Sequence, residues 1–208
     1  MHALHFIFTL HQKLGLYAAF LCVVGLFLSW PVVHYRIGAV ARLPLAVFRA
    51  VLRAVGPQPS LARLAGVIFG FNVIVIFIDM ALGVHPVVPR LLCMWTGMNV
   101  GIIAGLGDEA GLAFPRAAAP GRWRPSRPLA ALCGLAVILL ELPCFWLTIA
   151  MGMSLGYAVQ SGASDYASGL AVRAQAYATV IAPLLACSAL AEAVAIRGAA
   201  PRPPQEEQ

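Results

Sequence analysis

The chain has 208 residues, of which 61% are apolar and only 11% are charged. Soluble domains are about 45–50% apolar and about 25% charged, and a chain this short could not bury so much apolar surface in water. The composition therefore predicts an all-α integral membrane protein with lipid as its solvent. The net charge of +6 does not indicate nucleic-acid binding, because the basic residues are spread between apolar runs and no aromatic stacking platform accompanies them.

The first predicted membrane helix is the uncharged run 14–33, which is long enough to cross a hydrocarbon core of ~30 Å. The residues before it lack the positive segment and the cleavage site of a secretory signal, so we expect residues 1–35 to be a retained N-terminal transmembrane helix. Trp30 and Tyr35 flank its end, where amphipathic rings favour the membrane interface.

Residues 36–60 have a different pattern. Arg42, Arg49 and Arg53 recur at helical spacing among apolar residues. We expect a basic amphipathic helix that lies on the cytoplasmic leaflet, with its apolar face in the interface and these arginines on anionic lipid headgroups. Pro44 is expected in its first turn or at a kink.

Residues 61–197 form the predicted helical membrane domain, and residues 198–208 form a proline-rich polar tail that we expect to be disordered. The third segment is short and rich in glycine, which leaves two alternatives: a complete crossing, or a broken, re-entrant helix that dips into the bilayer. The predicted spans of this domain are residues 61–82, 90–107, 129–158 and 174–196.

The distribution of Lys and Arg predicts the orientation. If the N-terminus is outside and all five segments cross, 11 basic residues lie inside and 3 outside. Because cytoplasmic loops are enriched in Lys and Arg, this ratio favours a multi-pass protein of the bacterial cytoplasmic (inner) membrane, with the N-terminus outside and the C-terminus inside. A re-entrant third segment would change this count.

Three acidic residues lie inside predicted spans: Asp79, Glu141 and Glu192. A carboxylate at mid-membrane costs at least ~2.5–3.5 kcal/mol, so each must face other helices, face water or be protonated. Glu141 is the deepest, and both a proton relay and a structural bond, for example to the carbonyl that Pro143 frees near Leu139, fit its position. For Asp79 and Glu192, near segment ends and therefore near water, we expect a structural role.

Other polar and small residues indicate contacts between helices. Asn72 and Asn99 are expected to hydrogen-bond across helices. Small-xxx-small patterns let two helix backbones approach closely. The glycines in such patterns are Gly97, Gly101, Gly152 and Gly156.

No motif indicates catalysis or a bound cofactor. The five histidines lie at segment ends or in loops, and the five cysteines lie in apolar runs without a C-x-x-C pair. His2 and His5 stand one helical turn apart, but a haem or metal site needs ligands that face each other across helices. H-E-x-x-H, Walker and Ser-His-Asp patterns do not occur. We therefore expect no metal, no cofactor and no enzymatic activity.

Residues 64–196 combine three features. An Asn-bearing helix leads through a glycine to a Gly-x-x-x-Gly segment, a Glu-Leu-Pro motif is followed by paired glycines, and the last helix carries a late Glu. The residues are Asn72, Gly83, Gly97, Gly101 and Gly105, then Glu141, Leu142, Pro143, Gly152 and Gly156, and finally Glu192. In this combination the chain resembles the stage II sporulation protein M family. The N-terminal part has no counterpart in the resemblance.

The resemblance implies a membrane protein that works with partners. The sporulation member acts with cell-wall hydrolases during engulfment, and relatives outside spore formers are often regarded as partners of larger assemblies or transporters. Family members often carry Pro-His-Gly just before the Glu-Leu-Pro motif, where this chain has Ala136, Val137 and Ile138. A proton-handling role of that histidine would be missing here.

We therefore expect a non-catalytic integral membrane scaffold or accessory subunit, whose partners are the lipid bilayer and other membrane proteins. One alternative is a transporter or channel-like component that uses the intramembrane carboxylates. A weaker alternative is a subunit of an electron-transfer complex.

Overall fold

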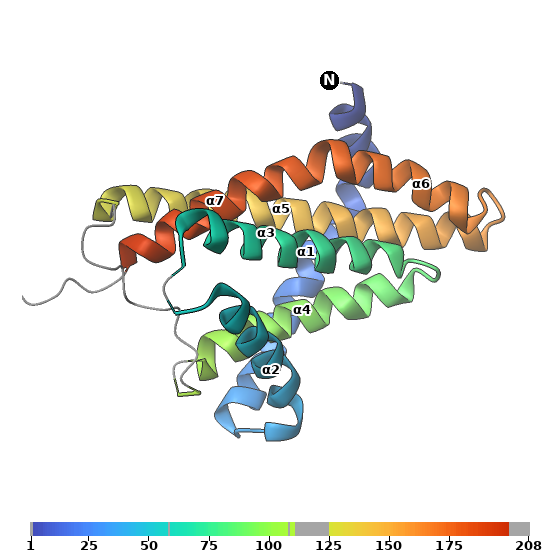
Figure 1. Ribbon diagram of the computed structural model, residues 1–208. Coiled ribbons are helices and arrows are strands. Elements are labelled where there is room, and N and C mark those ends of the chain that lie inside the picture. The colour runs from blue at the N-terminus through green and yellow to red at the C-terminus, as the bar shows by residue number, and fades with distance from the viewer. Residues whose placement is uncertain (1, 58, 108, 111–124, 200–208) are drawn as a thin grey trace, which may run out of the picture.

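The computed structural model describes residues 2–57, 59–107, 109–110 and 125–199, and this part of the chain is almost entirely helical, without strands. The predicted tail lies outside the described residues from position 200 onward. In chain order the elements are α1 (His2–His34), α2 (Gly38–Val55), α3 (Leu61–Ala81), α4 (Val87–Leu106), α5 (Arg127–Gln160), α6 (Tyr166–Ala176), the π-helical segment η1 (Tyr177–Ile181) and α7 (Ala182–Ala199) (Figure 1).

The predicted all-α membrane architecture is confirmed. Five helical segments are long and apolar enough to cross a membrane. The last one begins earlier than predicted, because the Asp165 side chain caps α6 by accepting a hydrogen bond from the Ser168 amide at 2.9 Å. This bond holds the pKa of Asp165 below its usual value. The segments are Gln12–His34, Leu61–Ala81, Val87–Leu106, Arg127–Gln160 and Tyr166–Gly198.

The third segment is a complete helix. α4 runs without interruption from Val87 to Leu106, and Pro89 lies in its first turn, where the missing N–H group costs no hydrogen bond. The alternative of a broken helix is therefore wrong for this segment.

Contacts between helices show that α1 and α4 run in the same direction. Gly97 lies against the Cys22 backbone, and Gly105, two turns further along α4, lies against Val33 further along α1. α3 and α5 are parallel in the same way, since Asn72 meets Glu141 and Gly83 meets Gly152.

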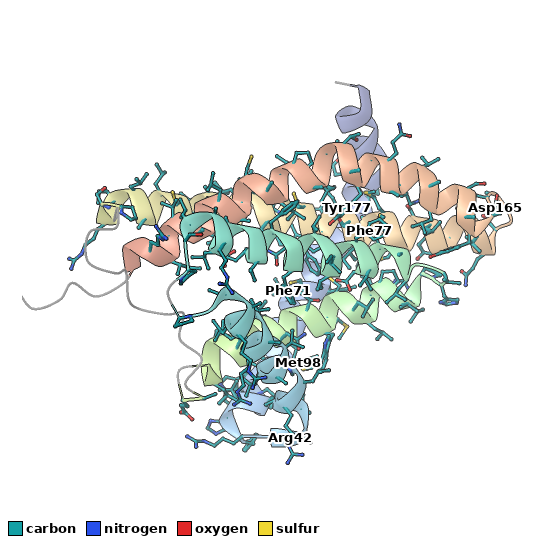
Figure 2. The ribbon with its side chains drawn as sticks, in the orientation of Figure 1. Arg42, Phe71, Phe77, Met98, Asp165 and Tyr177 are labelled. Atoms are coloured by element: carbon teal, nitrogen blue, oxygen red, sulfur yellow. The ribbon has the colours of Figure 1, made fainter. Side chains whose placement is uncertain are left out.

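The last span runs opposite to α3. The Tyr166 hydroxyl donates to the carbonyl of Ala81 at the end of α3, whereas Tyr177, further along, donates to Val73 at 2.6 Å. The Phe77 ring packs edge-on against Tyr177, with ring centroids 5.3 Å apart (Figure 2). Successive spans therefore alternate in direction. α3, α5 and α6–α7 lie side by side, and α1 crosses them obliquely (Figure 1).

Because the spans alternate in direction, the basic residues in the described part of the chain lie at the two ends of the bundle, in unequal numbers. Figure 2 shows Arg42 at the bottom of the molecule, far from Asp165 at its right-hand edge. Lys13, Arg90 and Arg173 lie towards the Asp165 end. The opposite end, called the basic end below, carries Arg36, Arg42, Arg49, Arg53, Arg63, Arg127 and Arg197.

The amphipathic helix α2 lies beside α3 and α4 at the basic end. Its buried residues are Ala41, Pro44 and Val55, and Pro44 lies inside the helix without ending it. The helix stops at Gly56, where φ is +80°, a conformation that glycine adopts without strain. Its charged face is exposed and carries Arg42, Arg49 and Arg53.

Candidate functional site

Glu141 connects three helices. Asn72 of α3 donates a hydrogen bond from Nδ2 to Glu141 Oε1 at 3.0 Å, and Ser188 of α7 donates from Oγ to Oε2 at 3.3 Å. The predicted bond from Glu141 to a carbonyl near Leu139 is wrong, because the side chains of two neighbouring helices supply both partners. α5 continues through Pro143 as one helix.

Glu192 lies beside this cluster. It follows Ser188 by one helical turn on α7, so the two side chains share a face. Glu192 and Glu141 line one pocket of about 150 Å³, whose apolar walls come mainly from α2 and α3. The structure therefore brings Glu192 and Glu141 to one pocket, although they lie in different predicted spans. The apolar lining includes Val47, Val51, Ile68 and Phe71.

Asp79 is separate from this pocket. It lies two turns after Asn72 on α3, which places it about 10 Å further along the helix axis. Its side chain is only 6% exposed, and its Oδ2 atom has no hydrogen-bond partner among the described residues. Asp79 lies near the end of α3, as expected, but its side chain is buried inside the bundle and does not face water.

Asn99 does not join Asn72 in the cluster around Glu141. It lies on α4, and its Oδ1 atom is buried without a hydrogen-bond partner within the described part of the chain. Large apolar side chains fill the core of the bundle. They include Met80, Ile149, Met153, Ile181 and Leu185, all fully buried.

The predicted glycines lie where helix backbones touch. A Cβ atom on Gly97 would overlap the Cys22 carbonyl, and one on Gly101 would overlap Ser29. Gly25 of α1, which the sequence patterns missed, lies against the Met94 carbonyl and completes this interface. On the other side of the bundle, Gly152 and Gly156 of α5 receive the end of α3 and the start of α4.

Two arginines that sequence reasoning did not single out connect helices away from the basic end. Arg90 donates to the Tyr157 hydroxyl, and its guanidinium lies over the rings of Tyr17 and Tyr157, 5.7 and 5.6 Å from their centroids. Arg173 donates from Nη2 to Ser154 Oγ at 3.0 Å and is half-buried between α5 and α6. In the sequence, each of them is a lone arginine beside a long apolar run, and this pattern could have indicated a contact between helices.

The described residues contain no group of three or more His, Cys, Asp or Glu side chains that could hold a metal ion. The cysteines are free, and the thiols of Cys22 and Cys93 lie against each other between α1 and α4.

These features define a polytopic α-helical membrane protein whose buried polar side chains join neighbouring helices. A family model described as Stage II sporulation protein M matches residues 18–195, and the chain belongs to this family. The match begins well before the predicted resemblance at 64–196, so α2 and most of the first span have counterparts in the family, contrary to our expectation. Searches among curated proteins and among solved structures gave no match.

Proposed function

We propose that the protein is a non-catalytic accessory subunit or scaffold of a larger complex in the bacterial cytoplasmic membrane. The observation that supports this role best is the use of Glu141. Both of its oxygens accept hydrogen bonds from fixed side chains, those of Asn72 and Ser188. A carboxyl that connects three helices in this way stabilises the arrangement of the bundle. A partner protein in a complex binds to the surface that this arrangement forms.

The proposed orientation places the basic end in the cytoplasm. Lys and Arg residues near span ends are retained on the cytoplasmic side during insertion. The unequal gathering of arginines at the two ends of the described bundle supports this orientation. The N-terminus would then lie outside and the C-terminus inside.

The proposal is tested by the mass of the complex. The full chain is extracted from its native membrane in a mild detergent, and the particle mass is measured by light scattering together with the stoichiometry of its components. We expect the 22.0 kDa chain to migrate in a larger particle with other membrane proteins at fixed ratios. Glu141→Gln, which preserves both hydrogen bonds, should retain these partners. A monodisperse particle that contains this chain alone would overturn the proposal.

A transporter or channel-like component is the second candidate, favoured by the pocket that Glu141 and Glu192 share. Two carboxyls at one small pocket beside the amphipathic helix α2 could exchange a proton or a cation. In that case Glu141→Gln should abolish a proton or cation flux in reconstituted vesicles although the variant still assembles. Wild-type flux from that variant would exclude this role for Glu141.

A further inference from the structure

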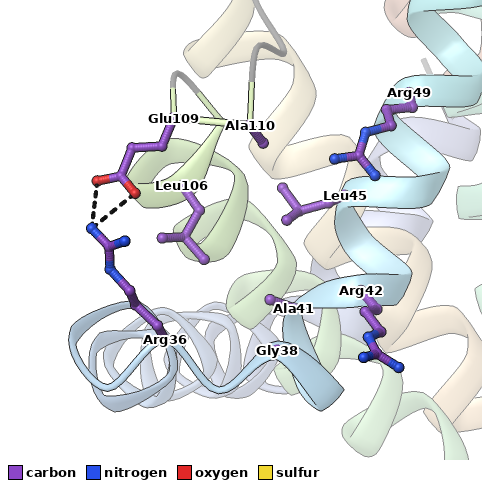
Figure 3. Close-up of a pocket in the computed structure, with 9 residues that line it drawn as sticks. All are labelled: Arg36, Gly38, Ala41, Arg42, Leu45, Arg49, Leu106, Glu109 and Ala110. Carbon is purple, nitrogen blue, oxygen red and sulfur yellow. Dashed lines mark hydrogen bonds and ion pairs between the residues drawn. The ribbon is translucent and has the colours of Figure 1, made fainter.

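A second pocket, of about 350 Å³, lies at the basic end between the α1–α2 turn, α2 and the end of α4. Three arginines line it, Arg36, Arg42 and Arg49, together with Glu109. Between them the walls are apolar. Figure 3 shows Leu45 of α2 pointing across the pocket towards Leu106 of α4.

The charges of this pocket are only partly balanced. Arg36 forms an ion pair with Glu109, with Nη2 and Oε2 3.1 Å apart (Figure 3). Arg42 and Arg49 have no carboxylate partner within the described part of the chain. They stand two turns apart on α2, and Leu45 lies between them on the same face. The pocket therefore presents two positive charges on either side of an apolar patch.

We propose that this pocket binds the headgroup of an anionic phospholipid. A phosphodiester carries one negative charge, and its oxygens match the planar donor fork of a guanidinium. Arg42 and Arg49 would bind the phosphate, while Leu45 and Leu106 contact the glycerol and the first acyl carbons. A free phosphate ion would leave this apolar patch in water, so the lining favours a lipid. The amphipathic helix α2 places the pocket at the depth of headgroups.

The structure also separates the three arginines that the sequence grouped together as headgroup ligands. Arg42 and Arg49 line the pocket, whereas Arg53, which is also exposed on the same helix, does not. Arg53 is therefore a matched control for charge and position. This inference does not depend on the proposed scaffold role, because a lipid site can exist on a scaffold or on a transporter.

The test is lipid binding to the purified full chain, measured by native mass spectrometry after titration with phosphatidylglycerol or phosphatidylcholine. We expect a one-to-one adduct with phosphatidylglycerol at concentrations where phosphatidylcholine gives none. Arg42→Gln and Arg49→Gln should each weaken this adduct about tenfold, since each removes a charge-assisted hydrogen bond. Arg53→Gln should leave it nearly unchanged.

A variant with stronger lipid binding is needed as well, because misfolding could explain a loss of binding in the arginine variants but not a gain. Glu109→Gln releases Arg36 from its ion pair and removes a negative charge, so it should strengthen the phosphatidylglycerol adduct. Equal adducts with both lipids in the wild type would overturn the proposal, as would an equal loss from Arg53→Gln and Arg42→Gln. Displacement of the lipid by inorganic phosphate at equal concentration would show a site for free phosphate instead.

Discussion

Glu141 accepts one hydrogen bond on each carboxyl oxygen, and the two donors come from different helices. Glutamine can replace it, because its oxygen accepts from the Asn72 amide and its NH₂ group donates to the Ser188 hydroxyl. We predict that Glu141→Gln keeps the stability of the bundle. Glu141→Leu leaves the Asn72 amide without an acceptor and should destabilise the bundle by ~1–3 kcal/mol. Unfolding of both variants in one detergent measures the difference. A glutamine variant as unstable as the leucine variant would show that the charge itself is required.

At the scale of single residues, the sequence predicted which polar side chains lie inside the bundle better than it predicted their partners. The depth of Glu141 follows from the apolar run around it, but its partner Ser188 does not, because the order of residues does not say which helices are neighbours. Asp79 shows the opposite error. Its place near the end of a span suggested contact with water, yet its side chain is buried inside the bundle.

The interface between α1 and α4 depends on the absence of side chains at a few glycines. A Cβ atom on Gly97 would meet the Cys22 backbone, which cannot move aside without moving the whole helix. We predict that Gly97→Ala destabilises the protein by ~1–3 kcal/mol through overpacking. Gly70→Ala is the control, since a Cβ atom there meets nothing within 4 Å, and alanine should stabilise that helix by up to about 1 kcal/mol. The measurement is the thermal unfolding of the two variants. Equal changes in stability for Gly97→Ala and Gly70→Ala would contradict close packing at Gly97.

The helices themselves were largely predictable, because length and hydropathy alone define an apolar span. The predicted ranges 14–33, 61–82 and 129–158 correspond to α1, α3 and α5. The predicted start of the last span at 174 was too late, since α6 is less apolar and begins at the Asp165 cap. Glycine content suggested a break in the third segment, whereas in α4 the glycines serve contact with α1.

For the whole molecule, the composition predicted a membrane protein, and the count of Lys and Arg predicted that one end of the bundle is more basic than the other. Neither predicted where α2 lies. Its position beside α3 and α4 creates both pockets, the one shared by Glu141 and Glu192 and the one lined by Arg42 and Arg49. Such an arrangement depends on which faces pack together in three dimensions. An amphipathic pattern indicates only that one face is apolar.

The alternating directions of the spans make the orientation testable at two exposed serines. Ser161 lies in the turn after α5, at the end opposite to the arginines, and Ser126 precedes α5 at the basic end. With a membrane-impermeant maleimide on intact cells, we predict labelling of Ser161→Cys but not of Ser126→Cys. The latter should react only after permeabilisation, and the unsubstituted chain reports labelling of its own cysteines. The reverse pattern would place the basic end outside, and the pocket of Arg42 and Arg49 would then face the outer leaflet.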